Sequence, residues 1–362
     1  MKIQHLKVIN FRNYEKIELD FNDNYNIFYG YNGSGKTNLV EAIYVLAITK
    51  SFRGSVDNVL VMNNKDYLKI DGVVEDNYKD KYSIALGKNG KNVKINDNKI
   101  NKLSDYISKI SVVLFCPDNL RFIKDSPGVR RDSINIEISQ LNNLYLKCLN
   151  QYNKVLKQRN NYLKTMNING NSSQDYLNVL TDKLIDNGLR IYEFRKKYIG
   201  YLNDKLSGYY YKICNNDNLC LDYVSDYKLN DKSKIMEKYK ENLNRDIILG
   251  KTSFGIHHDD IKFKLDGKNI KDFGSEGQQK NAIIAYKLSL IDLFKEKKGH
   301  YPILILDDLF SELDKQKINN ILNLIDDSVQ TFITTTEIDK INLNVIKKSK
   351  IFHVIEGTVR ED

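Results

Sequence analysis

The sequence predicts an α/β fold, made of one sheet domain that is interrupted by an inserted α-helical lobe and carries an added antiparallel β-sheet. Three observations predict it. A glycine-rich loop, residues 30–37, joins a strand-like run at 25–29 to a helix-like run at 37–48. An apolar run that ends in two aspartates, residues 303–308, lies close to the C-terminus. Between them, apolar residues recur at spacings of three and four, which is typical of long helices.

The glycine-rich loop predicts a phosphate-binding site. Residues 30–37, GYNGSGKT, match the pattern G-x-x-x-x-G-K-[ST], in which backbone N–H groups and the start of a helix surround phosphate oxygens. We expect Lys36 to contact the β- and γ-phosphates of ATP, and Thr37 to ligate Mg²⁺. The predicted nucleotide-binding residues of this segment are Gly30, Tyr31, Asn32, Gly33, Ser34, Gly35, Lys36, Thr37 and Asn38.

The apolar run that ends in two aspartates completes the predicted site. Asp307 follows four apolar residues, as a Mg²⁺-holding aspartate does in P-loop ATPases, and it lies 271 residues after Lys36. So large a gap indicates that the helical segment interrupts one ATPase domain. Asp308 stands where many such enzymes carry glutamate, and its shorter side chain predicts slow hydrolysis. Asp307, Asp308 and Lys36 are the expected catalytic residues.

A third segment, residues 273–280 (FGSEGQQK), resembles the signature motif of ABC-type ATPases, in which a serine reaches the γ-phosphate held by the opposite protomer. The resemblance implies that Ser275, Gly277 and Gln278 bind nucleotide across an ATP-dependent homodimer. A plain serine helix cap explains the same residues. Residues 311–314 resemble a D-loop, residues 334–336 replace a frequent histidine with threonine, and Asp118 stands at a candidate Q-loop position.

The remaining pattern divides the chain into three parts. Residues 1–125 and 246–362 predict the two halves of the ATPase domain, and residues 126–245 predict the helical lobe. Two apolar seams, 134–155 and 177–202, favour an antiparallel hairpin whose first helix would extend about 55 Å, although two ordinary helices on a globular core fit as well. The predicted strands are 2–9, 16–21, 25–29, 67–73, 81–86, 92–95, 112–115, 261–265, 303–306, 331–334 and 351–355.

Charge and composition favour a polyanionic partner. The net charge is +9, which points to nucleic acid before membrane, and no apolar run approaches the length of a membrane span. The N-terminus lacks a signal-peptide core, so a cytoplasmic location is expected. The segment 257–260 (HHDD) predicts hydrogen bonding more than a metal site. Between residues 139 and 170 there are five basic and no acidic residues, and a DNA-binding stripe or a solvated helix face is expected from Lys147, Lys154, Lys157 and Lys164.

Four segments together resemble the bacterial RecF family of recombination proteins, over essentially the whole length. They are 6–14 (LKVINFRNY), 126–131 (SPGVRR), 255–260 (GIHHDD) and 306–314 (LDDLFSELD). The third departs from the family, which usually reads Gly-Pro-His-Arg-Asp-Asp, so a charged arginine is lost at His258.

The resemblance implies an ABC/SMC-head-like P-loop ATPase that binds single-stranded DNA and single-strand/double-strand junctions. It further implies work with RecR and RecO in loading RecA, a part in recombinational gap repair and replication-fork maintenance, and support of the SOS response. Two alternatives remain: an SMC-like structural ATPase head, and a transporter ATP-binding subunit, against which the 271-residue gap argues.

Overall fold

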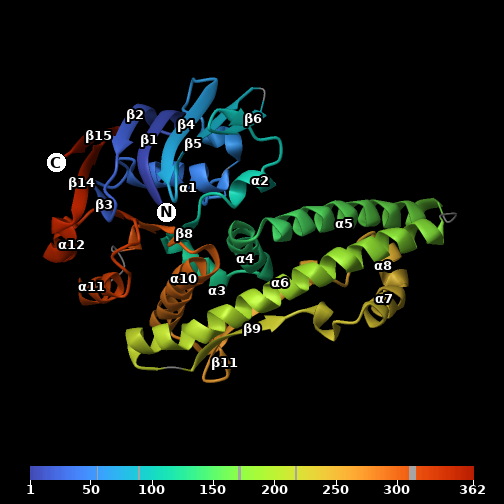
Figure 1. Ribbon diagram of the computed structural model, residues 1–362. Helices are drawn as coiled ribbons and strands as arrows, with labels where there is room; N and C mark the ends of the chain where they lie inside the picture. The colour runs from blue at the N-terminus through green and yellow to red at the C-terminus, as the bar shows by residue number, and fades with distance from the viewer. Residues whose placement is uncertain (55, 89, 170–172, 217, 310–314) are drawn as a thin grey trace. The chain divides into compact units, whose positions relative to one another are not determined.

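The computed structural model describes residues 1–54, 56–88, 90–169, 173–216, 218–309 and 315–362 (Figure 1). The chain divides into two compact units. The first comprises Met1–Leu120, Tyr211–Asn215 and Ile283–Asp362, and the second comprises Arg121–Tyr210 and Asn216–Ala282. Residues 246–282, assigned above to the second half of the ATPase domain, are thus grouped with the helical segment by this division.

The first unit contains two six-stranded sheets, one of them the added antiparallel sheet that the sequence predicted. One sheet has the order β15-β14-β3-β13-β12-β8, in which all strands except β15 run parallel. Its strands are β3 Tyr25–Tyr29, β8 Val112–Phe115, β12 Ile303–Asp307, β13 Thr331–Thr335, β14 Ser349–Ile355 and β15 Thr358–Glu361. The strands β8, β12 and β13 are buried on both faces, which explains their unbroken apolar runs.

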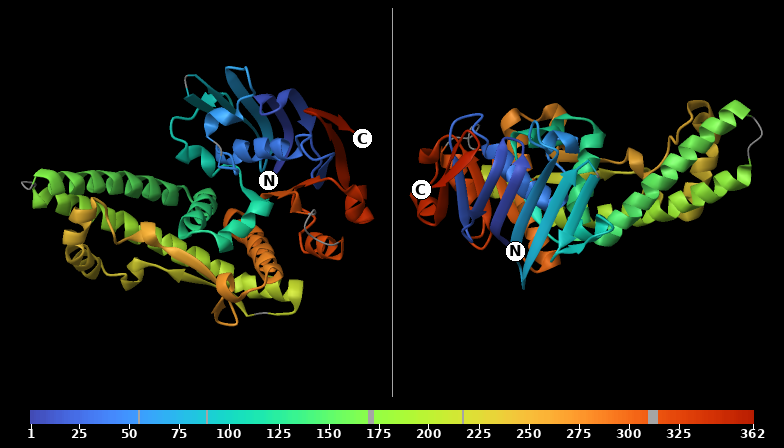
Figure 2. Two further views of the ribbon diagram at one scale, coloured as in Figure 1. Left: turned by 180° about the vertical axis from the view of Figure 1, so that it is seen from behind. Right: turned by 90° about the horizontal axis from the view of Figure 1, so that it is seen from above.

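The other sheet is antiparallel, with the order β2-β1-β4-β5-β6-β7. Alternate residues of β1 and β4 are buried, because one face packs on helix α1 and the other faces solvent (Figure 2). The strands are β1 Lys2–Phe11, β2 Tyr14–Asp20, β4 Tyr67–Glu75, β5 Lys79–Gly87, β6 Gly90–Ile95 and β7 Asn98–Lys99. The helices of this unit are α1 Lys36–Ile48, α2 Ser104–Ile107, α11 Lys315–Asn323 and α12 Leu343–Lys347, and α10 Glu276–Lys298 enters it from the second unit.

The second unit is mainly helical. Its helices are α3 Arg121–Lys124, α4 Pro127–Leu141, α5 Asn143–Asn169, α6 Gln174–Cys214, α7 Lys232–Glu241, α8 Leu243–Leu249 and α9 Ile270–Phe273. A small antiparallel sheet has the order β11-β10-β9, from Lys268–Asn269, Asp260–Leu265 and Leu219–Val224. Helices α5 and α6 lie side by side in both figures, in the part of the chain where a hairpin was predicted.

The prediction of one 55 Å helix before the hairpin turn is wrong. Asn142 is extended, with φ −148° and ψ 112°, and it separates α4 from α5. Its side chain accepts a hydrogen bond from the N–H of Leu144 at 2.8 Å, so it caps the new helix. The heptad pattern continues across this break because residues on both sides face the same core. The new helix extends through Asn169.

Candidate nucleotide-binding site

The predicted phosphate loop and acidic strand meet at one edge of the parallel sheet. β3 ends at Tyr29 and leads into the loop, β12 ends at Asp307, and the neighbouring β13 ends at Thr335. The parallel register places Asp307 beside Thr334. This edge, where the carboxyl ends of parallel strands meet, is where α/β sheets bind ligands.

The loop requires glycine at Gly35. Its φ is +116°, and a Cβ there would lie 2.6 Å from Asn13 Nδ2 and 2.9 Å from Tyr14 Oη. Tyr14 donates a hydrogen bond to the Gly35 carbonyl at 3.0 Å, and Asn13 donates to the Ser34 carbonyl at 3.3 Å. Asn13 and Tyr14 therefore support the loop through these hydrogen bonds. Sequence analysis noted both residues only as part of segment 6–14 and did not predict this role.

Lys36 is held inside the curl of the loop. Its Nζ donates to the carbonyls of Gly30 at 2.7 Å and Tyr31 at 2.8 Å, and the residue is 7% exposed. Burial lowers the pKa of this ammonium, and Asp308 and Asp307 act in the opposite direction. Both carboxylates therefore favour the charged form of the ammonium.

Thr37 and Asp307 are brought together across 270 residues of chain. Thr37 Oγ1 donates to Asp307 Oδ1 at 2.9 Å, and Thr334 Oγ1 donates to the same oxygen at 2.8 Å. Burial raises the pKa of Asp307, and these two hydroxyls oppose the shift. A hydroxyl and a carboxylate in contact are oxygen ligands of the type that Mg²⁺ prefers. Sequence reasoning did not foresee that Thr334 contacts Asp307.

Asp308 has a left-handed backbone, with φ +49°, and its N–H donates to Thr334 Oγ1 at 2.9 Å. Aspartate and asparagine tolerate this conformation better than other residues with a side chain. The backbone thus gives a local reason for aspartate at a position where related ATPases often carry glutamate.

The surroundings of Ser34 indicate whether the loop can hold a phosphate. Its hydroxyl is buried and has no hydrogen-bond partner within the chain, although most buried polar groups have one. An acceptor oxygen inside the loop would satisfy it. The orphaned hydroxyl, the inward ammonium and the helix start at Lys36 together fit a bound triphosphate.

The Ser275 segment begins helix α10 in the second unit and is exposed. The Ser275 N–H donates to Gln278 Oε1 at 2.8 Å, and the Gln278 N–H lies 3.3 Å from Ser275 Oγ. These reciprocal bonds form a capping box, so the helix-cap role is present. Gly277 has open space around its missing side chain, with only Ser275 Oγ as near as 4.0 Å. A side chain at position 277 would meet no close neighbour in this chain, so the fold itself does not explain why this residue is glycine.

Three other predicted positions lie as follows. Residues 311–314, the D-loop candidate, lie outside the described residues. Thr336 and Asp118 are exposed, and Thr335 caps the turn after β13 by accepting from the Glu337 N–H at 3.0 Å. The roles predicted for them stay predictions.

The HHDD segment is part of a buried polar network of the second unit. Asp259 Oδ2 accepts from Arg195 at 2.6 Å and from Tyr223 at 2.5 Å, and Asp260 accepts from Arg130 Nη2 at 3.1 Å. The described residues contain no cluster of candidate metal ligands. The hydrogen bonds from Arg195, Tyr223 and Arg130 confirm a hydrogen-bonding role for Asp259 and Asp260.

His257 makes this network sensitive to acid. Its ring nitrogens contact Tyr152 Oη at 2.7 Å and the Thr252 carbonyl at 3.1 Å, and burial lowers its pKa to about 4. Since unfolding restores a pKa near 6.5, the unfolded chain takes up the proton first as the pH falls. The stabilisation present above pH 6.5 is therefore lost between pH 6.5 and 4, by about 3 kcal/mol at most.

Urea unfolding of the wild type at pH 7 and pH 5, compared with H257Q, measures this effect. We expect a flatter pH dependence in H257Q and an unaltered one in the control H353Q. The assignment would be contradicted if the free energy of unfolding changed equally between pH 7 and pH 5 in wild type and in H257Q.

The four lysines of the predicted DNA stripe are exposed along α5, as expected. Arg159, the fifth basic residue of that segment, is not. It is 1% exposed and donates to Asp246 at 2.9 Å, Thr252 at 2.7 Å and Thr181 at 3.1 Å. It is a structural residue with no surface for DNA.

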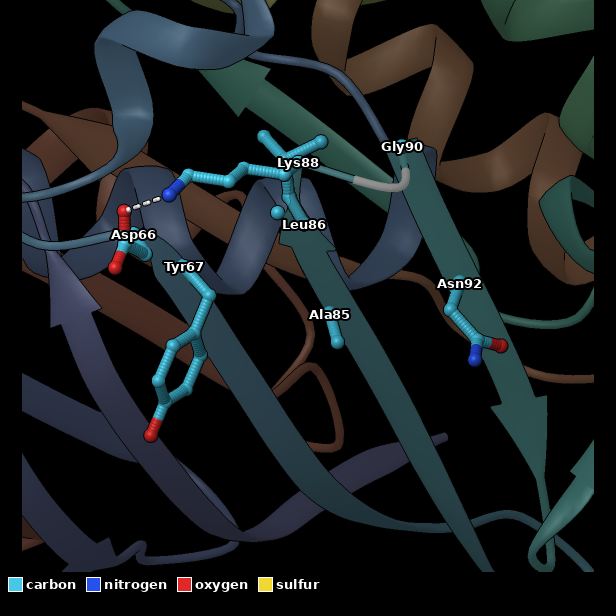
Figure 3. Close-up of a pocket in the computed structure, with 8 residues that line it drawn as sticks. Asp66, Tyr67, Ala85, Leu86, Lys88, Gly90 and Asn92 are labelled. Carbon is cyan, nitrogen blue, oxygen red and sulfur yellow. Dashed lines mark ion pairs between the residues drawn. The ribbon is translucent and has the colours of Figure 1, made fainter.

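A hollow of about 390 Å³ lies on strands β4 to β6, away from the phosphate loop (Figure 3). Ala85, Leu86 and Gly87 of β5 are among its lining residues, and Lys88 and Asp66, which also line it, form an ion pair of 2.9 Å. It shares no lining residue with the nucleotide site.

No described helix is both long and apolar enough to cross a membrane.

Comparison with known proteins agrees with this geometry. The family model of the RecF/RecN/SMC N-terminal domain matches residues 2–359. "DNA replication and repair protein RecF" of Oenococcus oeni is 39% identical, with 99% of each chain covered, and that of Listeria innocua is 36% identical over 100% of each. The chain belongs to the RecF family. As a RecF-family protein it has the ATP-binding ATPase fold of DNA replication and repair proteins.

Solved structures give the same result. One described as the recombination mediator protein RecF with ATP in the RecFOR pathway is 30% identical, has a TM-score of 0.92, and covers 99% of this chain and 97% of its own. An Smc head bound to the C-winged helix domain of ScpA has a TM-score of 0.54 and 16% identity, which shows a shared fold only. The RecF family thus accounts for the long helical insertion that a transporter subunit would not need.

Proposed function

We propose that two copies of this RecF-family chain close around ATP and thereby hold DNA during recombinational gap repair and replication-fork maintenance. Lys36, Thr37 and Asp307 of one copy would hold the triphosphate and Mg²⁺, and Ser275, Gly277 and Gln278 of the other would contact the γ-phosphate. Bound Mg²⁺ would neutralise phosphate charge. The same proposal includes single-stranded and junction DNA, RecR and RecO as partners in loading RecA, and support of the SOS response.

The proposal of a dimer rests on the surface around Ser275. Phe273 is 74% exposed, and Gly277 stands in a first helical turn where alanine would fit and would stabilise the helix by about 0.5–1 kcal/mol. An exposed aromatic ring and an unexplained glycine at a helix N-terminus suit the close approach of a phosphate held by another chain.

Ser275→Asp tests this contact separately from the helix cap, because aspartate caps helices well but repels phosphate. We expect S275D to bind ATP as a single copy with unaltered affinity and to lose ATP-dependent dimerisation. Analytical ultracentrifugation with ATP, a non-hydrolysable analogue and ADP measures this, with S328A as an exposed-serine control. Dimerisation of S275D equal to wild type would refute the proposed contact.

Slow hydrolysis is the second expectation. Turnover of the wild type should stay below about 10 per second, since the Asp308 carboxylate reaches the attacking water less well than glutamate would. D308E should hydrolyse faster per folded molecule, although its left-handed backbone strains that residue. Steady-state phosphate release, with D327E as control, checks both, and wild-type turnover above this value would contradict the proposal.

A further inference from the structure

The hairpin formed by β14 and β15 lies beside the phosphate loop. β14 pairs in parallel with β3, the strand that leads into the loop, and the register places His353 opposite Tyr29 (Figure 1). The two rings stack, with centroids 4.5 Å apart and planes inclined by 5°. Since β3 ends at Tyr29 and β14 continues to Ile355, the last residues of β14 and the turn to β15 follow the loop itself.

Two backbone contacts join the hairpin to the loop. At the start of the loop, a Cβ on Gly30 would lie 2.3 Å from the Val354 carbonyl oxygen, so the two backbones touch directly. Further along, the Gly357 N–H donates to the Ser34 carbonyl at 3.1 Å. Asn13 Nδ2 donates to the same carbonyl at 3.3 Å. The Ser34 carbonyl therefore has two donors, and neither belongs to the loop.

Holding this carbonyl orients the N–H group that follows it. The Ser34 C=O and the Gly35 N–H belong to one planar trans peptide unit, so they point in opposite directions. With the carbonyl directed at the Gly357 N–H, the Gly35 N–H must point to the other side. Gly35 is buried, and its N–H has no acceptor among the described residues. Such orphaned N–H groups are rare, and a phosphate oxygen would supply the acceptor.

The turn between β14 and β15 requires glycine at its second residue. Ile355 pairs with Thr358, so the turn has two residues, Glu356 with φ +44° and Gly357 with φ +80°. Two-residue hairpin turns of this kind need a positive φ at both positions. A Cβ on Gly357 would also lie 2.6 Å from the Asn13 carbonyl oxygen. A side chain there would therefore displace the turn and draw the Gly357 N–H away from the loop.

The hairpin of β10 and β11 has a matching turn that touches nothing. Leu265 pairs with Lys268, and between them Asp266 has φ +50° and Gly267 has φ +77°. A Cβ on Gly267 would have no heavy atom within 4 Å. Alanine at either glycine has the same unfavourable backbone, but only alanine at Gly357 would disturb the phosphate loop.

We propose that Gly357 is a positioning residue for nucleotide binding, because its N–H holds the Ser34 carbonyl and thereby orients the Gly35 N–H toward a phosphate. The inference rests on the proposed nucleotide site and adds to it a hairpin that no sequence motif marked. Backbone N–H groups of such loops surround the α- and β-phosphates, so ADP reports the effect and dimerisation need not occur.

Selective isotope labelling allows the Gly35 amide to be observed directly. The sequence contains two Ser-Gly dipeptides, Ser34-Gly35 and Ser207-Gly208. Full-length protein labelled with carbonyl-¹³C serine and ¹⁵N glycine therefore gives two selected amide signals in a carbonyl-filtered nuclear magnetic resonance spectrum. Gly208 lies in α6, in the second unit, and serves as the internal reference.

ADP with Mg²⁺ is added to wild type, G357A and G267A. In wild type and G267A we expect saturating ADP to shift the Gly35 amide proton, because a hydrogen bond to phosphate changes its shielding, while Gly208 stays in place. In G357A this shift should fall by about half or more. The ADP affinity of G357A, from isothermal titration calorimetry, should be about tenfold weaker, as partial loss of a charge-assisted hydrogen bond predicts. A purely structural role would leave the shift at saturation unaltered.

A second variant removes the donor without adding a side chain. Glycolic acid at position 357, introduced by nonsense suppression, replaces the N–H with an ester oxygen and keeps the turn. It should also weaken ADP binding by about tenfold, and it decides the question should G357A not fold.

The outcomes separate the positioning role from the nucleotide site. If ADP leaves the Gly35 amide of the wild type unshifted, the proposed site itself is wrong. If the wild type responds and both variants at position 357 bind ADP with wild-type affinity, only the positioning role is refuted. An equal loss in G267A would refute it as well, since the effect would then come from the strained turn alone.

Discussion

Replacing Lys36 with alanine should weaken ATP binding by about 100-fold and abolish ATP-dependent dimerisation. The ammonium is held by the carbonyls of Gly30 and Tyr31, and in the proposed site it would make charge-assisted bonds worth about 1.5–3 kcal/mol each to a phosphate. K36R should also fail, because a planar guanidinium cannot occupy the same curl of the loop. Titration with a fluorescent ATP analogue and sedimentation with ATP measure both effects.

The matched control for this change is K50A, at the exposed lysine just beyond the end of helix α1. It removes the same charge near the same helix and should bind ATP as the wild type does. ATP affinity of K36A within threefold of wild type would show that the glycine-rich loop is not the phosphate site, whatever the dimer does.

Replacing Arg195 with alanine should destabilise the second unit by about 3–5 kcal/mol. Arg195 and Asp259 are each 1% exposed at their side chains and lie 2.6 Å apart, so removing the guanidinium leaves a buried carboxylate without its counter-charge. Arg195 also donates to the Ile256 carbonyl at 2.9 Å and to Asn135 at 3.0 Å. Urea unfolding at pH 7, followed by circular dichroism, gives the free-energy difference.

R190A is the matched control on the same helix, five residues away and exposed, and should change stability by no more than about 0.5 kcal/mol. The double variant R195M/D259N should lose less than the sum of its two single variants, because the charges interact directly. Equal losses in R195A and R190A would mean that the buried pair contributes nothing to the fold.

The strands and the phosphate loop were predictable from local pattern. The strands 25–29 and 112–115 were predicted with the bounds that the structure shows, because each is an apolar run ended by a glycine or a proline turn. The proximity of Thr37 and Asp307 also followed, since parallel strands bring their carboxyl ends to one edge. The contact of Thr334 with Asp307 did not follow, because it depends on which strand lies beside β12.

The helical unit shows where local pattern was insufficient. The apolar seam continues from α4 into α5, so periodicity alone could not reveal the break at Asn142. In the sequence, Gly188 and Arg195 are the non-apolar positions within the second seam, 177–202. The structure shows that Gly188 makes room for Tyr227 and that Arg195 is a buried partner of Asp259. Both roles depend on residues more than 30 positions away, which spacing along one helix cannot show.

By itself, the sequence determined the glycine-rich loop, the acidic strand and the family, because each depends on residues next to one another in the chain. Only the tertiary structure decided that Arg159 is buried while Lys183, Arg190 and Lys197 are exposed. Whether a basic side chain is a buried partner or a surface charge depends on what the rest of the chain places beside it, and those neighbours are set by folding.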